Sequence, residues 1–121
     1  MTSSENFGSE FRLRRTADFQ HVYSRRRTAS DDVLIIYGCE NDLGHPRIGL
    51  SVSRKVGGAT IRNRWKRRLR EAFRKARAEL PSGIDLVVIP RAAPEPDFEN
   101  LQKSLVKLVT RVAAKLAKDK V

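Results

Sequence analysis

The sequence predicts a single α+β domain, a compact sheet covered by helices on one face. The chain has 121 residues, of which 40% are hydrophobic, enough for one modest core. Segments with helical spacing alternate with β-branched segments in the order helix, strands, helix, strand, helix. No repeat or low-complexity linker divides them. We therefore expect a flexible tail over residues 1–10 and one folded domain over residues 11–121.

The first helix is predicted to start near Thr16, a residue type that caps helix N-termini. Asp18 then lies in the first turn, where the helix dipole favours an acid. Phe19 and Tyr23 are four residues apart and share one face of this helix.

Two strands are predicted next, over "VLIIYGC" (33–39) and "RIGLSVS" (47–53), with a loop between them. The second segment alternates, so that Ile48, Leu50 and Val52 point to one face. Its other face is small and polar, and is therefore open to solvent or to a ligand. We expect the two strands to pair as a hairpin.

A long amphipathic helix is predicted over about residues 59–79, after the break at "VGG" (56–58) and before "LPSG" (80–83). Its apolar positions fall within an arc of roughly 120° at helical spacing. They are Ile61, Trp65, Leu69, Ala72, Phe73, Ala76 and Leu80.

The last two elements are a strand and a helix. "IDLVVIP" (84–90) is apolar apart from Asp85, which is typical of a buried central strand. Asp97 is predicted to cap a final helix with an apolar stripe over Phe98, Leu101, Leu105, Leu108, Val109, Val112 and Leu116.

The formal net charge of +11 predicts a polyanionic partner, either nucleic acid or an anionic membrane surface. Most of the excess lies in residues 11–27, with a net charge of +5, and residues 61–77, with +8. If the fold brings these segments together, they form one positive surface. The polar first ten residues, the single cysteine and the absence of a long apolar run favour a cytoplasmic protein.

The predicted long helix holds nine bases and one acid between residues 61 and 77. A solvated surface helix is the simpler reading, but such helices usually mix charge signs. Like charges four residues apart repel, so this pattern favours counter-charge from bound phosphates. Outside the apolar arc lie Asn63, Lys66, Arg67, Arg70, Arg74 and Arg77.

Two weaker features lie outside this helix. Gly57 and Gly58 precede its N-terminus, where backbone amides can bind phosphate, although they also suit a strand-to-helix turn. Phe19 and Tyr23 lie among arginines, so stacking on unpaired bases and burial in the core are equally supported by the residues alone.

Catalysis by protein side chains has little support. His21 and His45 fall in unrelated places, and no pair of carboxylates or nucleophile–base set is suggested. We expect no catalytic residue and no metal ligand set in the polypeptide.

Residues 47–74, "RIGLSVSRKVGGATIRNRWKRRLREAFR", are similar to the signature of the bacterial ribonuclease P protein subunit, with Arg62-Asn63-Arg64 as its R-N-R core. "LRRTADFQHVY" (13–23) resembles the first helix of that family. The similarity covers about residues 13–116, nearly the whole chain.

This resemblance implies an α-β-β-β-α-β-α sandwich with a left-handed βαβ crossover, as in some ribosomal-protein domains. It implies that the chain is an RNA-binding protein that joins a catalytic RNA to remove the 5′ leader from precursor tRNA. The RNA and the Mg²⁺ bound mainly by it would perform the hydrolysis. No membrane and no obligate protein partner are implied.

The resemblance also assigns residues. Those expected to face the catalytic RNA are Lys55, Arg62, Asn63, Arg64, Arg67, Arg70 and Arg74. Those expected to line a leader-binding cleft are Phe19, Tyr23, Ile36, Ser51 and Arg54. The chain departs from the family in three places: Gly58 replaces the usual Asn, Ile36 stands where some members carry a cleft aromatic with Tyr37 on the opposite face, and Arg25–Arg27 is unusually basic.

Two alternatives remain at this point. A general RNA-binding or ribosomal protein would carry the same charge without leader specificity. A DNA-binding module is suggested by the mixture of Trp, Asn and Arg in "RNRWKRR", although homeodomains are all-helical and this segment follows strands.

Overall fold

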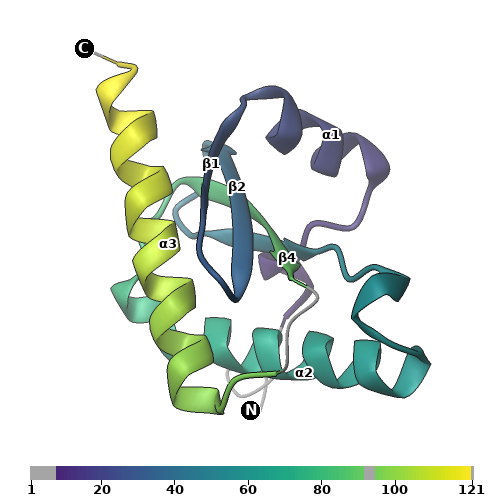
Figure 1. Ribbon diagram of the computed structural model, residues 1–121. Coiled ribbons are helices and arrows are strands. Elements are labelled where there is room, and N and C mark those ends of the chain that lie inside the picture. Colours follow the sequence, from purple (N-terminus) through teal and green to yellow (C-terminus); the bar gives the residue numbers. More distant parts are fainter. Residues whose placement is uncertain (1–7, 92–94, 121) are drawn as a thin grey trace.

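The computed structural model describes residues 8–91 and 95–120 and contains three α-helices and four strands within these ranges. The predicted tail is tested only at its end, where residues 9 and 10 belong to a 3₁₀ turn; residues 1–7 lie outside the described part. The elements in chain order are η2 Ser9–Phe11, α1 Thr16–Ser24, β1 Arg27–Ser30, β2 Leu34–Glu40, β3 Arg47–Leu50, η3 Arg54–Val56, α2 Ala59–Ala76, η4 Arg77–Glu79, β4 Ile84–Pro90 and α3 Phe98–Lys118. The α+β class and the α-β-β-β-α-β-α order are confirmed (Figure 1).

The four strands form one sheet in the order β1-β2-β4-β3. β4 pairs antiparallel with β2 and parallel with β3, and α2 makes the crossover between β3 and β4. The predicted hairpin of β2 with β3 is therefore wrong, because β4 lies between them. Apart from Asp85, which pairs with Arg47, β4 is apolar and largely buried on both faces, which fits its place between β2 and β3.

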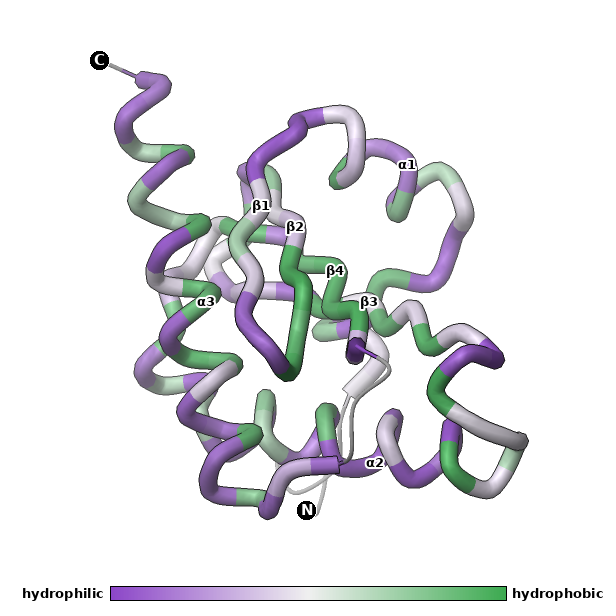
Figure 2. The backbone as a smooth tube through the Cα atoms, viewed as in Figure 1, coloured by the Kyte–Doolittle hydropathy of each residue, from purple (hydrophilic) through white to green (hydrophobic). Residues whose placement is uncertain are grey.

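Helices cover both faces of the sheet, which corrects the expectation of one covered face. α2 and α3 pack on one face against Ile36, Leu86 and Val88. α1 packs on the other face, against Val87 and its neighbours (Figure 1). Figure 2 shows the apolar strands in the middle of the molecule and mainly hydrophilic residues along α2. The apolar side chains between α1 and the sheet thus form a second, smaller hydrophobic cluster.

Three local expectations are corrected. Arg15 rather than Thr16 is the N-cap of α1, and no side chain caps that helix. Strand β1 was implied by the family resemblance but not found from the residue patterns, because its residues "RTAS" carry almost no strand signal of their own and depend on pairing with β2. Ile61 is 37% exposed and packs over Gly57 instead of the core.

The remaining helix predictions are confirmed. Trp65 and Leu69 are 2% and 0% exposed and fix α2 to the core. Asp97 caps α3, accepting a hydrogen bond of 2.8 Å from the Asn100 amide. No helix in the described ranges has the length and apolarity required to cross a bilayer.

Candidate RNA interface

The outer face of α2 carries basic side chains without acidic partners. Because Trp65 and Leu69 are buried, the residues on the opposite side of the helix turn outward. Asn63 and Arg67 are exposed, and Arg62, Lys66 and Arg70 are partly exposed. None of the four bases among them forms an ion pair with a carboxylate of the described residues. Apart from the buried Nε of Arg62, their donors are therefore available to an external anion.

Three other arginines of α2 are already engaged: Arg68 contacts Glu95 at 3.6 Å, and the other two are Arg64 and Arg74, which were assigned to the site from the sequence. Arg64 donates to Glu95 at 2.8 Å, and this hydrogen bond raises the pKa of the Arg64 guanidinium. Arg74 contacts Glu71 at 2.7 Å, one turn earlier on the same helix. Both were expected to face RNA, and both bring less uncompensated charge to the surface than Arg67 does.

The turn before α2 presents further positive charge. Arg54 and Lys55 are exposed in η3, and the Ser53 hydroxyl accepts a hydrogen bond from the Lys55 amide at 3.2 Å. Gly58 is the N-cap of α2 and supplies no side-chain cap. The first turn of α2 therefore has neither a capping side chain nor an acid to offset its exposed amides.

Aromatic rings gather between α1 and the sheet. Tyr23 and Tyr37 meet edge to face, with ring centroids 5.1 Å apart and an interplanar angle of 90°. Phe19 packs beside the same buried cluster, and all three rings remain partly exposed. The two earlier readings of Phe19 and Tyr23 thus combine, because each ring contacts the core and keeps part of its surface in solvent. We call Phe19, Tyr23 and Tyr37 the aromatic cluster.

The sheet beneath this cluster settles which β2 residue faces α1. Ile36 is 0% exposed and packs toward α2 and α3, so its expected place in a cleft is wrong. Tyr37, one residue on, occupies that face instead. On β3, the small face expected to be open is covered at Gly49, which is buried beneath Phe19 and Leu13, whereas Ser51, just after the strand, is partly exposed.

A pocket joins the aromatic cluster to α2. Its volume is about 180 Å³, and it is lined by Arg12, Leu13, Arg14, Phe19, Ile48, Leu50, Lys66 and Arg70. Burial and the nearby charges of Arg70 and Arg14 lower the pKa of Arg12, which shows that the two basic segments are close. We call this pocket the junction pocket. The prediction that the fold unites the two segments is confirmed for residues 12 and 14, whereas Arg25 and Arg27 pair with acids elsewhere.

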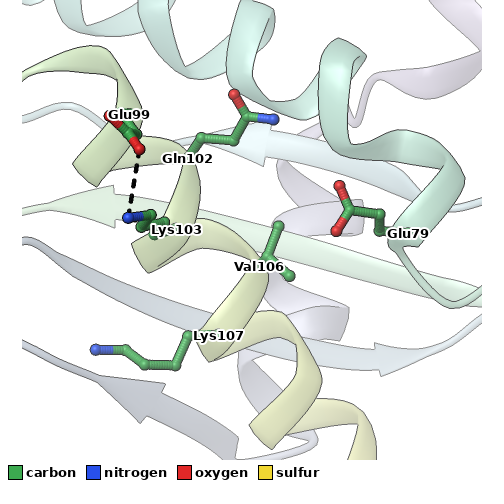
Figure 3. Close-up of a pocket in the computed structure, with 6 residues that line it drawn as sticks. All are labelled: Glu79, Glu99, Gln102, Lys103, Val106 and Lys107. Carbon is green, nitrogen blue, oxygen red and sulfur yellow. Dashed lines mark ion pairs between the residues drawn. The ribbon is translucent and has the colours of Figure 1, made fainter.

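A larger cavity, about 480 Å³, lies beside α3 and is lined by both acids and bases (Figure 3). Glu99 and Lys103 pair there at 3.4 Å, while Lys107 points away from Glu79. Its polar groups do not converge on one point. Within the described residues, no group of three or more His, Cys, Asp or Glu side chains is placed to hold a metal ion.

Three residues of this interface were not among the expected site residues. Tyr37 could have been found from the alternation of β2, in which Leu34 and Ile36 share the buried face. Lys66 was placed among the outward bases of the long helix but was not assigned to the site. Arg12 could not be assigned from the sequence, because the parallel bridge between Arg12 and Ile48, which brings the N-terminal segment alongside β3, depends on the tertiary fold.

Known proteins are similar to this chain in sequence and in fold. The family model described as Ribonuclease P matches residues 7–113. The ribonuclease P protein component of Thermoanaerobacter sp. strain X514 is 35% identical over 101 residues, covering 83% of this chain and 87% of the relative. The RNase P protein of Thermotoga maritima superposes with a TM-score of 0.76 at 33% identity, covering 83% of this chain and 96% of that one. The RNase P protein of Staphylococcus aureus gives 0.72 at 34% identity, with coverages of 85% and 94%.

Proposed function

The chain belongs to the ribonuclease P protein family, and on this premise we propose that it binds the catalytic RNA of ribonuclease P together with the 5′ leader of precursor tRNA. Proteins of this family are components of an endoribonuclease complex that acts in tRNA processing. The observation that carries the proposal is the junction pocket, where arginines that precede α1 and bases of α2 meet beside Phe19.

The α2 surface is assigned to the catalytic RNA. Arginine forks suit phosphate oxygens, and the side chains of Arg62, Arg67 and Arg70 have no competing carboxylate among the described residues. Asn63 lies exposed among them and can hydrogen-bond a base edge or a ribose hydroxyl. Lys55 and Arg54 extend this surface past the N-terminus of α2.

The aromatic cluster is assigned to the leader. Unpaired bases stack on aromatic rings, and Phe19, Tyr23 and Tyr37 each offer a partly exposed face. Ser51, just after β3, is partly exposed and has a small side chain, which permits close approach of a backbone beside the cluster. The junction pocket then accepts a phosphate between the stacked bases and the RNA held by α2.

Hydrolysis is assigned to the partner RNA and the Mg²⁺ bound mainly by it. The protein contributes positive charge, which lowers the repulsion between leader and catalytic RNA and so favours metal binding by the RNA at low Mg²⁺ concentration. It also holds the leader in one place, which reduces the entropy lost when the scissile bond meets the metal site.

Reconstitution at low Mg²⁺ tests the proposal. The protein is mixed with a bacterial ribonuclease P RNA and a precursor tRNA, and cleavage is compared with that by the RNA alone. Faster cleavage together with tighter binding of precursor than of mature tRNA is expected. Equal affinity for precursor and mature tRNA would instead indicate a general RNA-binding protein, and cleavage no faster than with RNA alone would reject the proposal.

A further inference from the structure

The turn between α1 and β1 carries three consecutive arginines that the α2 surface does not include. Arg25 and Arg27 both contact Asp119 at the end of α3, at 2.9 and 2.6 Å, and Arg25 also contacts Glu40 at 3.1 Å. Arg26 is exposed and forms no ion pair within the described residues. Two arginines therefore fasten the turn to α3, while the third projects into solvent.

The backbone of Arg26 makes its identity unexpected. Its φ angle is 60°, in the left-handed region that glycine and asparagine adopt far more readily than arginine. Backbone geometry alone would therefore favour another residue here. An arginine held in this conformation points to a role for its side chain.

Arg26 opens onto a pocket of about 240 Å³, lined by Arg26, Arg27, Thr28, Lys115, Lys118 and Asp119. We call it the Arg26 pocket. It contains four basic side chains and one acid, and that acid already binds two guanidinium groups. Lys115 also donates to the Thr28 carbonyl at 2.6 Å, which fixes the lysine beside β1. The pocket therefore has positive charge in excess and donors held in place.

The Arg26 pocket and the junction pocket lie at opposite ends of α1. Arg12 and Arg14 precede the helix, Phe19 and Tyr23 lie along it, and Arg26 follows it. The nine residues of α1 span about 13 Å at 1.5 Å per residue. The Arg26 pocket also lies at the end of α3 that is remote from α2 (Figure 1). An RNA strand that follows α1 past Tyr23 and turns over the edge strand β1 toward α3 reaches this pocket, whereas RNA confined to α2 does not.

We infer that the Arg26 pocket binds backbone phosphates of the single-stranded leader where the leader leaves the aromatic cluster. This inference rests on the function proposed above. Arginine and lysine contacts of this kind carry no base readout, so the pocket should act on leaders of any sequence. Its effect should appear only when the leader is long enough to extend past Tyr23.

The test combines Arg26→Asn with Lys118→Gln in the full chain, assembled with a bacterial ribonuclease P RNA. Asparagine suits the left-handed backbone, and Lys118 is exposed without an ion pair in the described residues, so the fold should persist. Affinity is measured for a precursor tRNA whose short leader ends within the aromatic cluster and for one whose leader extends beyond it. We expect about tenfold weaker binding of the long-leader precursor, a salt slope lower by about 1.4 for two lost single-strand contacts, and unchanged binding of the short-leader precursor.

The control is Arg91→Gln with Lys103→Gln, which removes two positive charges from exposed residues outside the Arg26 pocket, one of them paired with Glu99. It should keep the advantage of the long leader. Retention of that advantage by the Arg26→Asn, Lys118→Gln protein would overturn the inference, and so would equal weakening of both precursors, which would place the catalytic RNA in the pocket. Failure of the wild-type protein to accelerate cleavage of either precursor would instead reject the proposed function.

Discussion

The ring of Phe19 lies directly over the bare Cα of Gly49. A β-carbon added to Gly49 would come within 2.6 Å of Cζ of Phe19 and within 3.1 Å of Cβ of Leu13. The absence of a side chain at Gly49 thus allows the Phe19 ring of α1 to pack close to the sheet. The position of Phe19, and with it one wall of the junction pocket, depends on this contact.

Gly49→Ala should therefore displace Phe19 and cost about 1–3 kcal/mol in the free energy of unfolding, as overpacking in a tight contact does. Precursor tRNA binding should weaken, because the ring no longer stands where a base would stack. Urea unfolding and precursor affinity measure the two effects.

Phe19→Ala removes the ring and should weaken precursor binding by about 1–3 kcal/mol while mature tRNA binding is unchanged. A folded Phe19→Ala protein with normal precursor affinity would return Phe19 to a purely structural role.

Neighbouring residues on β2 give a second prediction, because they face opposite sides of the sheet. Tyr37→Ala should lower precursor affinity by about 1–3 kcal/mol if one base stacks on the ring. Ile36→Val should cost about 0.5–1.5 kcal/mol of stability and leave precursor affinity unchanged, since Ile36 is 0% exposed on the other face. Comparison of both variants in one binding assay checks the assignment, and the reverse pattern would contradict it.

The arginines of α2 should differ in their salt dependence. Arg67→Ala should lower the slope of log K against log salt for the catalytic RNA by about one unit, the loss of one phosphate contact. Arg64→Ala should lower it by less, because Arg64 is held by Glu95 at 2.7 Å. Glu95→Gln, which releases Arg64, should strengthen binding. Equal slope changes for the two arginines would mean that Glu95 does not compete with RNA.

The sequence predicts those parts of the fold that depend on local periodicity. The spacing of Trp65 and Leu69 identifies the buried face of α2, and the apolar run of β4 from Leu86 to Pro90 identifies a central strand. β1 could not be found in this way, because a four-residue strand with one buried residue has no periodicity to detect. The pairing of β3 with β4 instead of β2 is likewise set by burial of β4 and not by the adjacent loop.

The candidate site was predictable where side-chain direction follows from an element's own pattern. Asn63 and Arg67 face outward because Trp65 and Leu69 face inward. The ion pair of Arg64 was not predictable, since its partner Glu95 comes from a distant segment of the chain. Ion pairs between segments far apart in sequence depend on the tertiary fold, which charge counting cannot supply.

Asp31 makes the stability of the folded protein depend on pH. Its carboxylate accepts hydrogen bonds from the Val33 and Leu34 amides at 2.8 and 2.9 Å and from the Ser104 hydroxyl at 2.6 Å, and it contacts Lys107 at 3.1 Å. Burial raises the pKa of Asp31, but these hydrogen bonds together outweigh it and lower the pKa from 3.8 to about 2. The folded state therefore favours the ionised carboxylate.

A pKa lowered by folding stabilises the protein above the pKa of the unfolded chain, near 3.8, and this contribution disappears as the pH falls toward 2. Asp31→Asn should remove about 1–2 kcal/mol at neutral pH and flatten the dependence of stability on pH in this window. Urea unfolding between pH 2 and 7 measures both effects. Asp32→Asn, at the exposed neighbouring residue, is the matched control and should change stability by less than about 0.5 kcal/mol. An Asp31→Asn protein whose stability falls as steeply as that of the wild type in acid would show that other carboxylates carry the effect.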